Sequence, residues 1–206
     1  MKKVKALGLA LVVGFIPTQV SAAETPSLVS TATIDAISLK TISNNLIAGS
    51  VTDDSGILLG GLGSDLYHDP KDAKDVFYLI TDRGPNNDTV QPDKSAGTGF
   101  VVPNFSPVIL KVRINGTSVE ILESKAVALK NGKGVTGLPN LKGYDAVPTD
   151  VKGITSDSLY NVAGQDTEGI VRTRNGEFWV VDEYAPSLSR LSKDGVVKTR
   201  YVPTNW

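Results

Sequence analysis

The chain has no cysteine and only one histidine, His68, among its 206 residues. The absence of cysteine excludes disulfides, a thiol nucleophile and sulfur ligands for a metal. A single histidine excludes zinc sites that use two or three histidine ligands. A Ser-His-Asp triad would depend entirely on His68, and the sequence contains no G-x-S-x-G motif. We therefore expect His68, in "LYHDP", to cap or line a turn.

The sequence also lacks an apolar run of membrane length, which would need about 20 residues. Its longest apolar run, "ALGLALVVGF", follows three lysines near the N-terminus and precedes the small residues of "VSAA". This order is typical of a secretory signal peptide. We predict a signal over residues 1–23 and a mature domain over 24–206, without an integral membrane segment and located in the periplasm or secreted.

A strong excess of positive charge is missing as well. Lys2, Lys3 and Lys5 fall in the predicted signal, so the mature chain keeps 18 of the 21 basic residues against 22 acidic ones. Nucleic-acid binding needs a concentrated basic patch. We therefore expect a small-molecule partner and no nucleic acid.

What the sequence does contain is a series of β-type runs separated by turn residues, with no sustained helical periodicity. Two Asn-Gly pairs, Asn115–Gly116 and Asn175–Gly176, stand between alternating runs and predict tight hairpins. The mature chain is predicted to be all-β, with strands within residues 31–39, 46–51, 76–81, 107–114, 119–122, 126–129, 169–173, 177–181 and 195–202.

One sequence motif, a predicted strand together with the residues that directly follow it, occurs twice. "VFYLITDRGP" (76–85) and "EFWVVDEYAP" (177–186) align without gaps, 101 residues apart. Repeated antiparallel units of about 40 to 45 residues are typical of β-propeller blades. A β-propeller is therefore the predicted architecture. Because a propeller needs about four blades, nearly all the mature chain would be used, and we expect an open or C-terminally incomplete propeller.

Acidic residues surround the second hairpin. With a three-residue turn, Glu168 would lie opposite Asp182; with a two-residue turn it would lie opposite Glu183. Either register brings like charges together, which is unfavourable unless a cation or a shared proton compensates. Oxygen ligands favour a hard cation such as Ca²⁺. The alternative is that these acids are solvated or neutralised by nearby arginines: Arg83, Arg172 and Arg174.

The first copy of the repeat also ends in charged residues. Asp82 aligns with Glu183 in the repeat, so it is a further candidate metal ligand near the end of the hairpin that carries the other acids. Arg83 follows at the position of Tyr184 and could bind a phosphate or carboxylate of a substrate with two hydrogen bonds. A salt bridge from Arg83 to Asp82 or Glu168 is the competing interpretation.

These motifs resemble a known family. "GGLGSDLYHDP", "FYLITDRGP" and "DTEGIVRT" followed by "NGEFWVVDEYAPSLSRL" are similar to the phytase-like proteins described as having esterase-like activity, which are exported bacterial proteins of propeller type. The likeness spans residues 60–203. It implies hydrolysis of phosphate or carboxylic esters, with Ca²⁺ as a cofactor, and it maps the site onto Asp82, Arg83, Asp166, Glu168, Asp182 and Glu183.

Three functions follow as hypotheses. The first is a metal-assisted ester hydrolase in which Asp82, Asp166, Glu168, Asp182 and Glu183 supply metal ligands. In it Glu168, Asp182 and Glu183 serve catalysis and Arg83 binds the small-molecule ester. The second is a calcium-dependent propeller lactonase. The third is a non-catalytic exported propeller that binds a ligand and uses its acids structurally.

Overall fold

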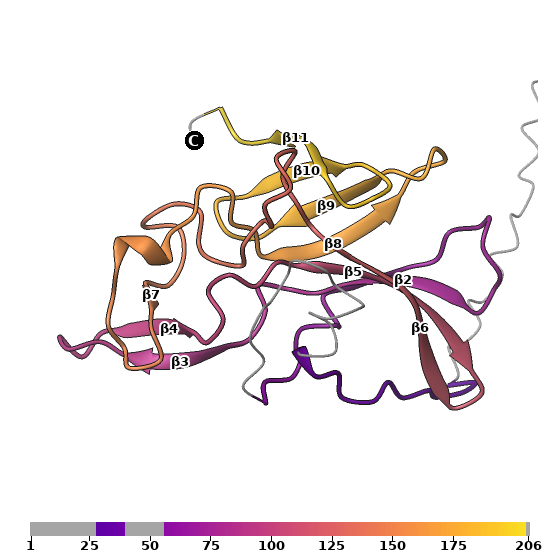
Figure 1. Ribbon diagram of the computed structural model, residues 1–206, viewed down its shortest axis with the longest axis horizontal. Helices are drawn as coiled ribbons and strands as arrows, with labels where there is room; N and C mark the ends of the chain where they lie inside the picture. The colour runs from indigo at the N-terminus through magenta and orange to yellow at the C-terminus, as the bar shows by residue number, and fades with distance from the viewer. Residues whose placement is uncertain (1–27, 40–55, 205–206) are drawn as a thin grey trace, which may run out of the picture. The chain divides into compact units, whose positions relative to one another are not determined.

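A computed structural model of the protein describes residues 28–39 and 56–204 (Figure 1). The chain forms two units, residues 1–30 and 31–206, and all features below belong to the second. The predicted signal, residues 1–23, lies outside the described residues. Eleven strands and one short 3-10 helix are assigned in the described part of the chain.

Two four-stranded antiparallel sheets make up most of the fold. The first sheet has the order β1-β2-β5-β6 and the second the order β11-β10-β9-β8. Figure 1 shows β8 next to β2 and β5, and both β1 and β2 contact β8. The strands of the first sheet are β1 (Asp65–Tyr67), β2 (Val76–Ile80), β5 (Val108–Asn115) and β6 (Ser118–Ala126). Those of the second are β8 (Thr167–Arg172), β9 (Phe178–Asp182), β10 (Ser187–Leu191) and β11 (Val197–Tyr201).

A third, smaller sheet is formed by β3 and β4, which lie between β2 and β5 in the chain, and by β7, which follows β6. In it β3 pairs antiparallel with β4, and β4 pairs parallel with β7. Its strands are β3 (Asn86–Val90), β4 (Ala96–Phe100) and β7 (Pro148–Thr149), and the 3-10 helix η2 (Asp157–Leu159) follows. The sequence did not predict β3 and β4, because "NNDTV" and "AGTGF" lack the apolar alternation of a half-buried strand.

Both predicted hairpins are confirmed. Asn115 pairs with Ser118, and Gly116 adopts a φ of 60° in the turn. In the second hairpin the Thr173 amide donates to the Glu177 carbonyl at 2.8 Å, and Gly176 adopts a φ of 85°. A side chain at either glycine would be strained at these positive φ angles, and this explains the Asn-Gly choice.

The all-β prediction is confirmed, whereas the propeller stays a prediction. Each four-stranded sheet has the strand number of a propeller blade, but residues 28–39 and 56–204 form no closed ring of sheets. The run at 31–39 makes only isolated bridges, at Thr33 and Ser38, and not the expected strand. Similarly, 126–129 adds one residue to β6 and isolated bridges at Ala128. The run at 46–51 lies outside the described residues.

The repeated motif occupies the same place in both four-stranded sheets. "VFYLI" is β2 and "FWVVD" is β9, each of them the second strand of its sheet. In each copy the strand is followed by an acidic residue and then a proline, Asp82 and Pro85 after β2 and Glu183 and Pro186 after β9. Consequently Asp82 and Arg83 leave the first sheet at the edge where Glu183 leaves the second, and this brings the charged residues into one region.

The two sheets are held together by an apolar core between them. Tyr78 of β2 and Phe178 of β9 meet edge to face, with ring centroids 5.5 Å apart. Ile80, Ile109 and Val180 belong to the same buried cluster. A second cluster covers the opposite face of the first sheet, where Leu39, Leu59 and Phe105 pack on Val108, Leu110 and Val112.

No helix among the described residues has the length and hydrophobicity to cross a membrane.

We predict that Phe178→Ala destabilises the protein by about 3–5 kcal/mol, because it leaves a cavity between the two sheets. Phe178 is only 2% exposed. The free energy of unfolding from urea titration measures the effect. The control is Val171→Ala on neighbouring β8, where the side chain is 50% exposed and the cost should stay within about 0.5 kcal/mol. Equal losses in the two variants would contradict the assigned core.

Candidate functional site

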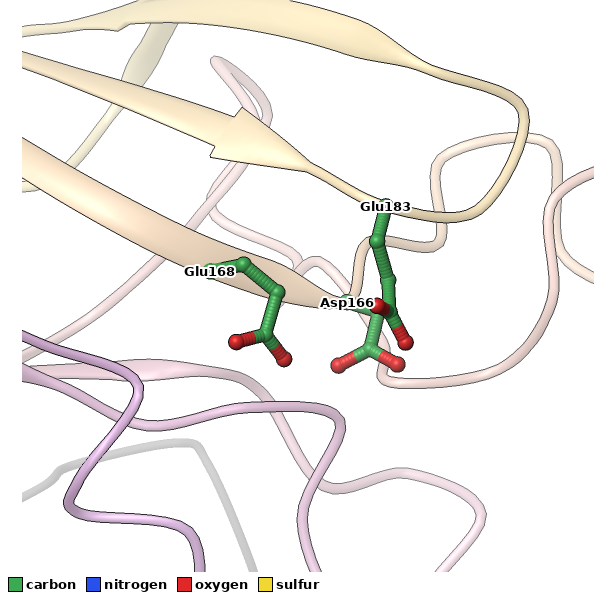
Figure 2. Close-up of side chains that lie close together, drawn as sticks. All are labelled: Asp166, Glu168 and Glu183. Atoms are coloured by element: carbon green, nitrogen blue, oxygen red, sulfur yellow. The ribbon is translucent and has the colours of Figure 1, made fainter.

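Three carboxyl groups meet where β8 begins and β9 ends. Asp166 immediately precedes β8, Glu168 lies within it, and Glu183 directly follows β9. One oxygen from each of the three lies within 4.8 Å of the others. Figure 2 shows the carboxyl groups on the same side of this pair of strands. We call these residues the acidic cluster.

The register of the hairpin explains this arrangement and corrects the predicted pairing. The turn has three residues, as one of the two predicted registers requires, because Thr173 pairs with Glu177. A β-bulge then shifts the register between Thr167 and Gly169, so that Thr167, not Glu168, pairs with Asp182. Glu168 is the extra residue of the bulge. The prediction that Glu168 faces Asp182 was therefore wrong, and the alternative pairing with Glu183 was wrong too.

The same bulge brings Asp166 opposite Glu183. The Glu183 amide donates to the Asp166 carbonyl at 3.0 Å. Without the bulge, Thr167 would lie opposite Glu183, and Asp166 would lie one position further along the chain. The bulge thus gathers Asp166, Glu168 and Glu183 at one edge, which the sequence alone does not reveal.

Asp166 is the most unusual member of the cluster, because its side chain is fully buried. Its Oδ1 accepts a hydrogen bond from the Arg83 amide at 2.9 Å. Its Oδ2 lies 2.8 Å from Arg83 Nε as an ion pair, yet accepts no aligned hydrogen bond from any described residue. Burial raises the pKa of Asp166 to about 8; Arg83 opposes this rise, and the charges of Glu183 and Asp82 add to it.

Arg83 is the central cation of the site. Besides the contact with Asp166, its Nη1 lies 3.2 Å from Asp145 Oδ2 and its Nη2 lies 3.3 Å from Glu183 Oε1. Burial opposes its charge, but the surrounding carboxylates raise the pKa of Arg83 overall. The salt bridges therefore run to Asp145, Asp166 and Glu183, and not to Asp82 or Glu168 as the competing interpretation had it.

Glu168 and Asp82 lie beside this centre. Burial raises the pKa of Glu168, and the charges of Glu183 and Asp82 raise it further, whereas Ser64 lowers it through a hydrogen bond. Asp82 is half-buried and accepts a hydrogen bond from the Gly84 amide at 2.7 Å. It also packs against Gly61, where an added Cβ would lie 2.1 Å from Asp82 Oδ1. Asp82 thus adds negative charge next to the cluster without belonging to it.

Asp182, a predicted ligand, is not one of the three residues of the acidic cluster. Its side chain is buried and accepts hydrogen bonds from five donors, on Asp166, Tyr184, Asn140, Ser187 and Arg200. Burial raises the pKa of Asp182, and these hydrogen bonds and the Arg200 charge oppose the rise. The structure therefore brings together Asp166, Glu168, Glu183 and Arg83 of the predicted set, places Asp82 beside them, and leaves Asp182 behind them.

Sequence reasoning missed three residues at this site, Asp145, Asn140 and Arg200, the last of which forms an ion pair with Asp182 at 2.6 Å. Asp145, 62 positions from Arg83 in the sequence, accepts a hydrogen bond from its guanidinium. Asn140, 42 positions from Asp182, donates a hydrogen bond to its carboxylate. Neither Asp145 nor Asn140 belongs to a motif or a repeat, so no signal in the sequence pointed to them. His68, in contrast, directly follows β1, and its Nδ1 lies 2.9 Å from the Val76 carbonyl oxygen at the start of β2.

The acidic cluster has the chemistry of a metal site. Its ligand atoms are carboxylate oxygens, which suit hard cations. Within the cluster, Asp166 Oδ2 is buried and has an ion pair with Arg83 Nε but no hydrogen bond from the described residues. A cation bound by the cluster would offset the repulsion among its three carboxylates. The cluster could therefore hold a metal ion.

Comparison with known proteins identifies a family for the chain. The model of the phytase-like family, described as "Esterase-like activity of phytase", matches residues 57–206. The match includes every residue of the acidic cluster, Arg83 and both copies of the repeat. Comparisons with curated proteins and with solved structures gave no match. Because the family model covers more than half of the chain, the protein belongs to the phytase-like family.

Proposed function

We propose that this protein is an exported, metal-assisted hydrolase of phosphate or carboxylic esters, with Ca²⁺ bound by the acidic cluster. The gathering of Asp166, Glu168 and Glu183 around Arg83 carries this proposal. Family membership supports a hydrolase-like activity. The signal-like N-terminus supports export to the periplasm or beyond.

The charge balance of the site supports a cation. Asp82, Asp145 and the three acids of the cluster give five carboxyl groups, while Arg83 gives one positive charge. Burial raises the pKa of Asp166 and of Glu168, and the neighbouring negative charges of Glu183 and Asp82 raise both further. A divalent cation would replace the protons that otherwise relieve this repulsion.

Each residue has a distinct role in the proposed site. Asp166, Glu168 and Glu183 hold the cation, which when bound supplies Lewis-acid polarisation of an ester oxygen. Arg83 orients the substrate. Its Nη contacts of 3.2 and 3.3 Å are longer than its 2.8 Å contact to Asp166, so a substrate oxygen can replace them while Nε stays in place.

Two alternative functions can be distinguished from this one by experiment. A calcium-dependent lactonase would use the same acids on a cyclic carboxylic ester, so comparing a phosphomonoester with a lactone separates the two. A non-catalytic binding protein would gain thermal stability from Ca²⁺ without hydrolysing a panel of esters. In all three we propose that the two four-stranded sheets act as blades of a propeller, since their strand number and repeated second strand agree with one.

We predict that Glu168→Gln and Glu183→Gln each weaken Ca²⁺ binding by at least about tenfold, because each variant removes a charged ligand. Ester hydrolysis should fall in parallel, and a chelator should abolish it in the unmodified protein. Calorimetric titration and a phosphomonoester assay measure the two effects.

The matched control is Glu123→Gln on β6, whose exposed carboxylate pairs with Lys125 and lies outside the site. This variant should bind Ca²⁺ and hydrolyse esters as the unmodified protein does. Hydrolysis that persists in chelator, or full activity in both cluster variants, would contradict the proposed function.

We also predict that, in chelator, the free energy of unfolding decreases as pH rises from about 5 to about 8. Asp166, Glu168 and Asp182 have raised pKa values, so the folded protein holds their protons more tightly than the unfolded chain. The resulting stabilisation is complete below about pH 4 and is lost as pH rises through the folded pKa values. Acids with lowered pKa values act oppositely, but below about pH 4.5; they include Asp69, Asp72 and Glu177.

Urea titrations at several pH values measure this slope. Asp166→Asn should flatten it, because the amide does not titrate. Saturating Ca²⁺ should flatten it as well, since a bound cation keeps the carboxylates deprotonated. A stability that rises between pH 5 and 8 in chelator would contradict the assigned pKa shifts.

A further inference from the structure

The carboxylate of Asp182 contacts two different parts of the molecule with its two oxygens. Oδ1 faces the backbone that carries the acidic cluster, and Oδ2 faces side chains of β10, of β11 and of the loop between β6 and β7. The side chain lies at the end of β9 and is 1% exposed. Asp182 thus lies between the cluster and the body of the sheet.

On the first side, Oδ1 accepts two backbone hydrogen bonds. The Asp166 amide donates at 2.9 Å and the Tyr184 amide at 3.2 Å. The Glu183 amide donates to the Asp166 carbonyl at 3.0 Å. The three bonds together fix the backbone of Asp166 relative to that of Glu183, and both residues belong to the cluster.

On the second side, Oδ2 is anchored by three side chains. Arg200 Nη2 lies 2.6 Å away, Ser187 Oγ 3.0 Å and Asn140 Nδ2 3.2 Å. Arg200 also donates to the carbonyls of Val162 and Gly164, at 3.0 and 3.1 Å. Arg200 comes from β11, the last strand of the sheet, so β11 is connected to the start of β8 through this guanidinium.

The Asn140 side chain adds a second connection on the same side. Its Oδ1 accepts a hydrogen bond from the Ala185 amide at 3.2 Å. The loop after β9 is therefore fixed through Tyr184 by Oδ1 of Asp182 and through Ala185 by Asn140.

This pattern distinguishes Asp182 from a ligand. A carboxylate has about four lone-pair positions, and Asp182 accepts five hydrogen bonds. Both oxygens are therefore occupied by protein donors, whereas Asp166 Oδ2 has an ion pair with Arg83 but no hydrogen bond from the described residues. We propose that Asp182 and Arg200 are a positioning pair that sets the spacing of Asp166 and Glu183 for cation binding. This role depends on the proposed Ca²⁺ site, and in it Asp182 does not touch the cation.

The test compares Asp182→Asn and Arg200→Lys with Glu177→Gln. The asparagine amide keeps the shape of Asp182 but turns one accepting oxygen into a donor. Glu177 pairs with Arg190 and Lys198 at the opposite end of β9, so its variant also removes ion pairs of this sheet, but partly exposed ones far from the cluster. Ca²⁺ affinity is measured by calorimetry at a temperature where circular dichroism shows each variant folded, with amide hydrogen exchange at Asp166 and Tyr184 as a second readout.

We expect Asp182→Asn to weaken Ca²⁺ binding about 10- to 100-fold, as loss of a group that orients ligands does, and to speed exchange of both amides. Arg200→Lys should weaken binding less, because the charge is kept, and Glu177→Gln should change it less than twofold. If Asp182→Asn lowers only the melting temperature and leaves affinity and exchange unchanged, the positioning role is overturned. If the unmodified protein binds no Ca²⁺, the proposed function fails first, and the role with it.

Discussion

The contact between Arg83 and Asp166 connects the two main sheets at the point where the site is built. Arg83 leaves the first sheet after β2, and Asp166 enters the second before β8. A buried carboxylate is costly unless it is paired and hydrogen-bonded, and Arg83 provides both an ion pair and a backbone amide. The apolar core below them, centred on Tyr78 and Phe178, brings the two sheets close enough for this contact.

Much of the architecture could be predicted from local patterns. Alternating apolar runs and two Asn-Gly turns identified β2, β5, β6, β8, β9 and β11, because these features depend on neighbours in sequence. The small sheet of β3, β4 and β7 could not be predicted, since its strands are polar and one pairing joins Thr98 to Pro148. The segment at 31–39 has strand-like alternation but packs as an extended cover over the first sheet.

The site was predicted in its members more than in its geometry. Four of the residues chosen from the sequence, Asp166, Glu168, Glu183 and Arg83, do lie together. The bulge at Glu168 changed their pairing, and a bulge depends on tertiary contacts that the alternation of residues does not encode. Asp182 shows the limit most clearly, because its acid type suggested a ligand whereas its surroundings make it an acceptor for protein donors.

Equivalent residues of the two copies of the repeat point in the same direction in the two four-stranded sheets. Tyr78 aligns with Trp179, and Phe77 with Phe178, when the two copies are superposed by sequence. Tyr78 faces the second sheet, and Trp179 lies on the face of the second sheet turned away from the first, since it alternates with buried Phe178 and Val180. Equivalent residues therefore point in the same direction, so the sheets stack head to tail.

Head-to-tail stacking has a directional consequence for assembly. The outward face of the second sheet exposes apolar side chains, among them Val181, Leu188 and Tyr201. The corresponding receiving face of the first sheet is already covered by Leu39, Leu59 and Phe105. A heterologous contact can propagate into a fibre only when both of its surfaces are open. Within the described residues one of the two is closed, by the same segments that complete the first core.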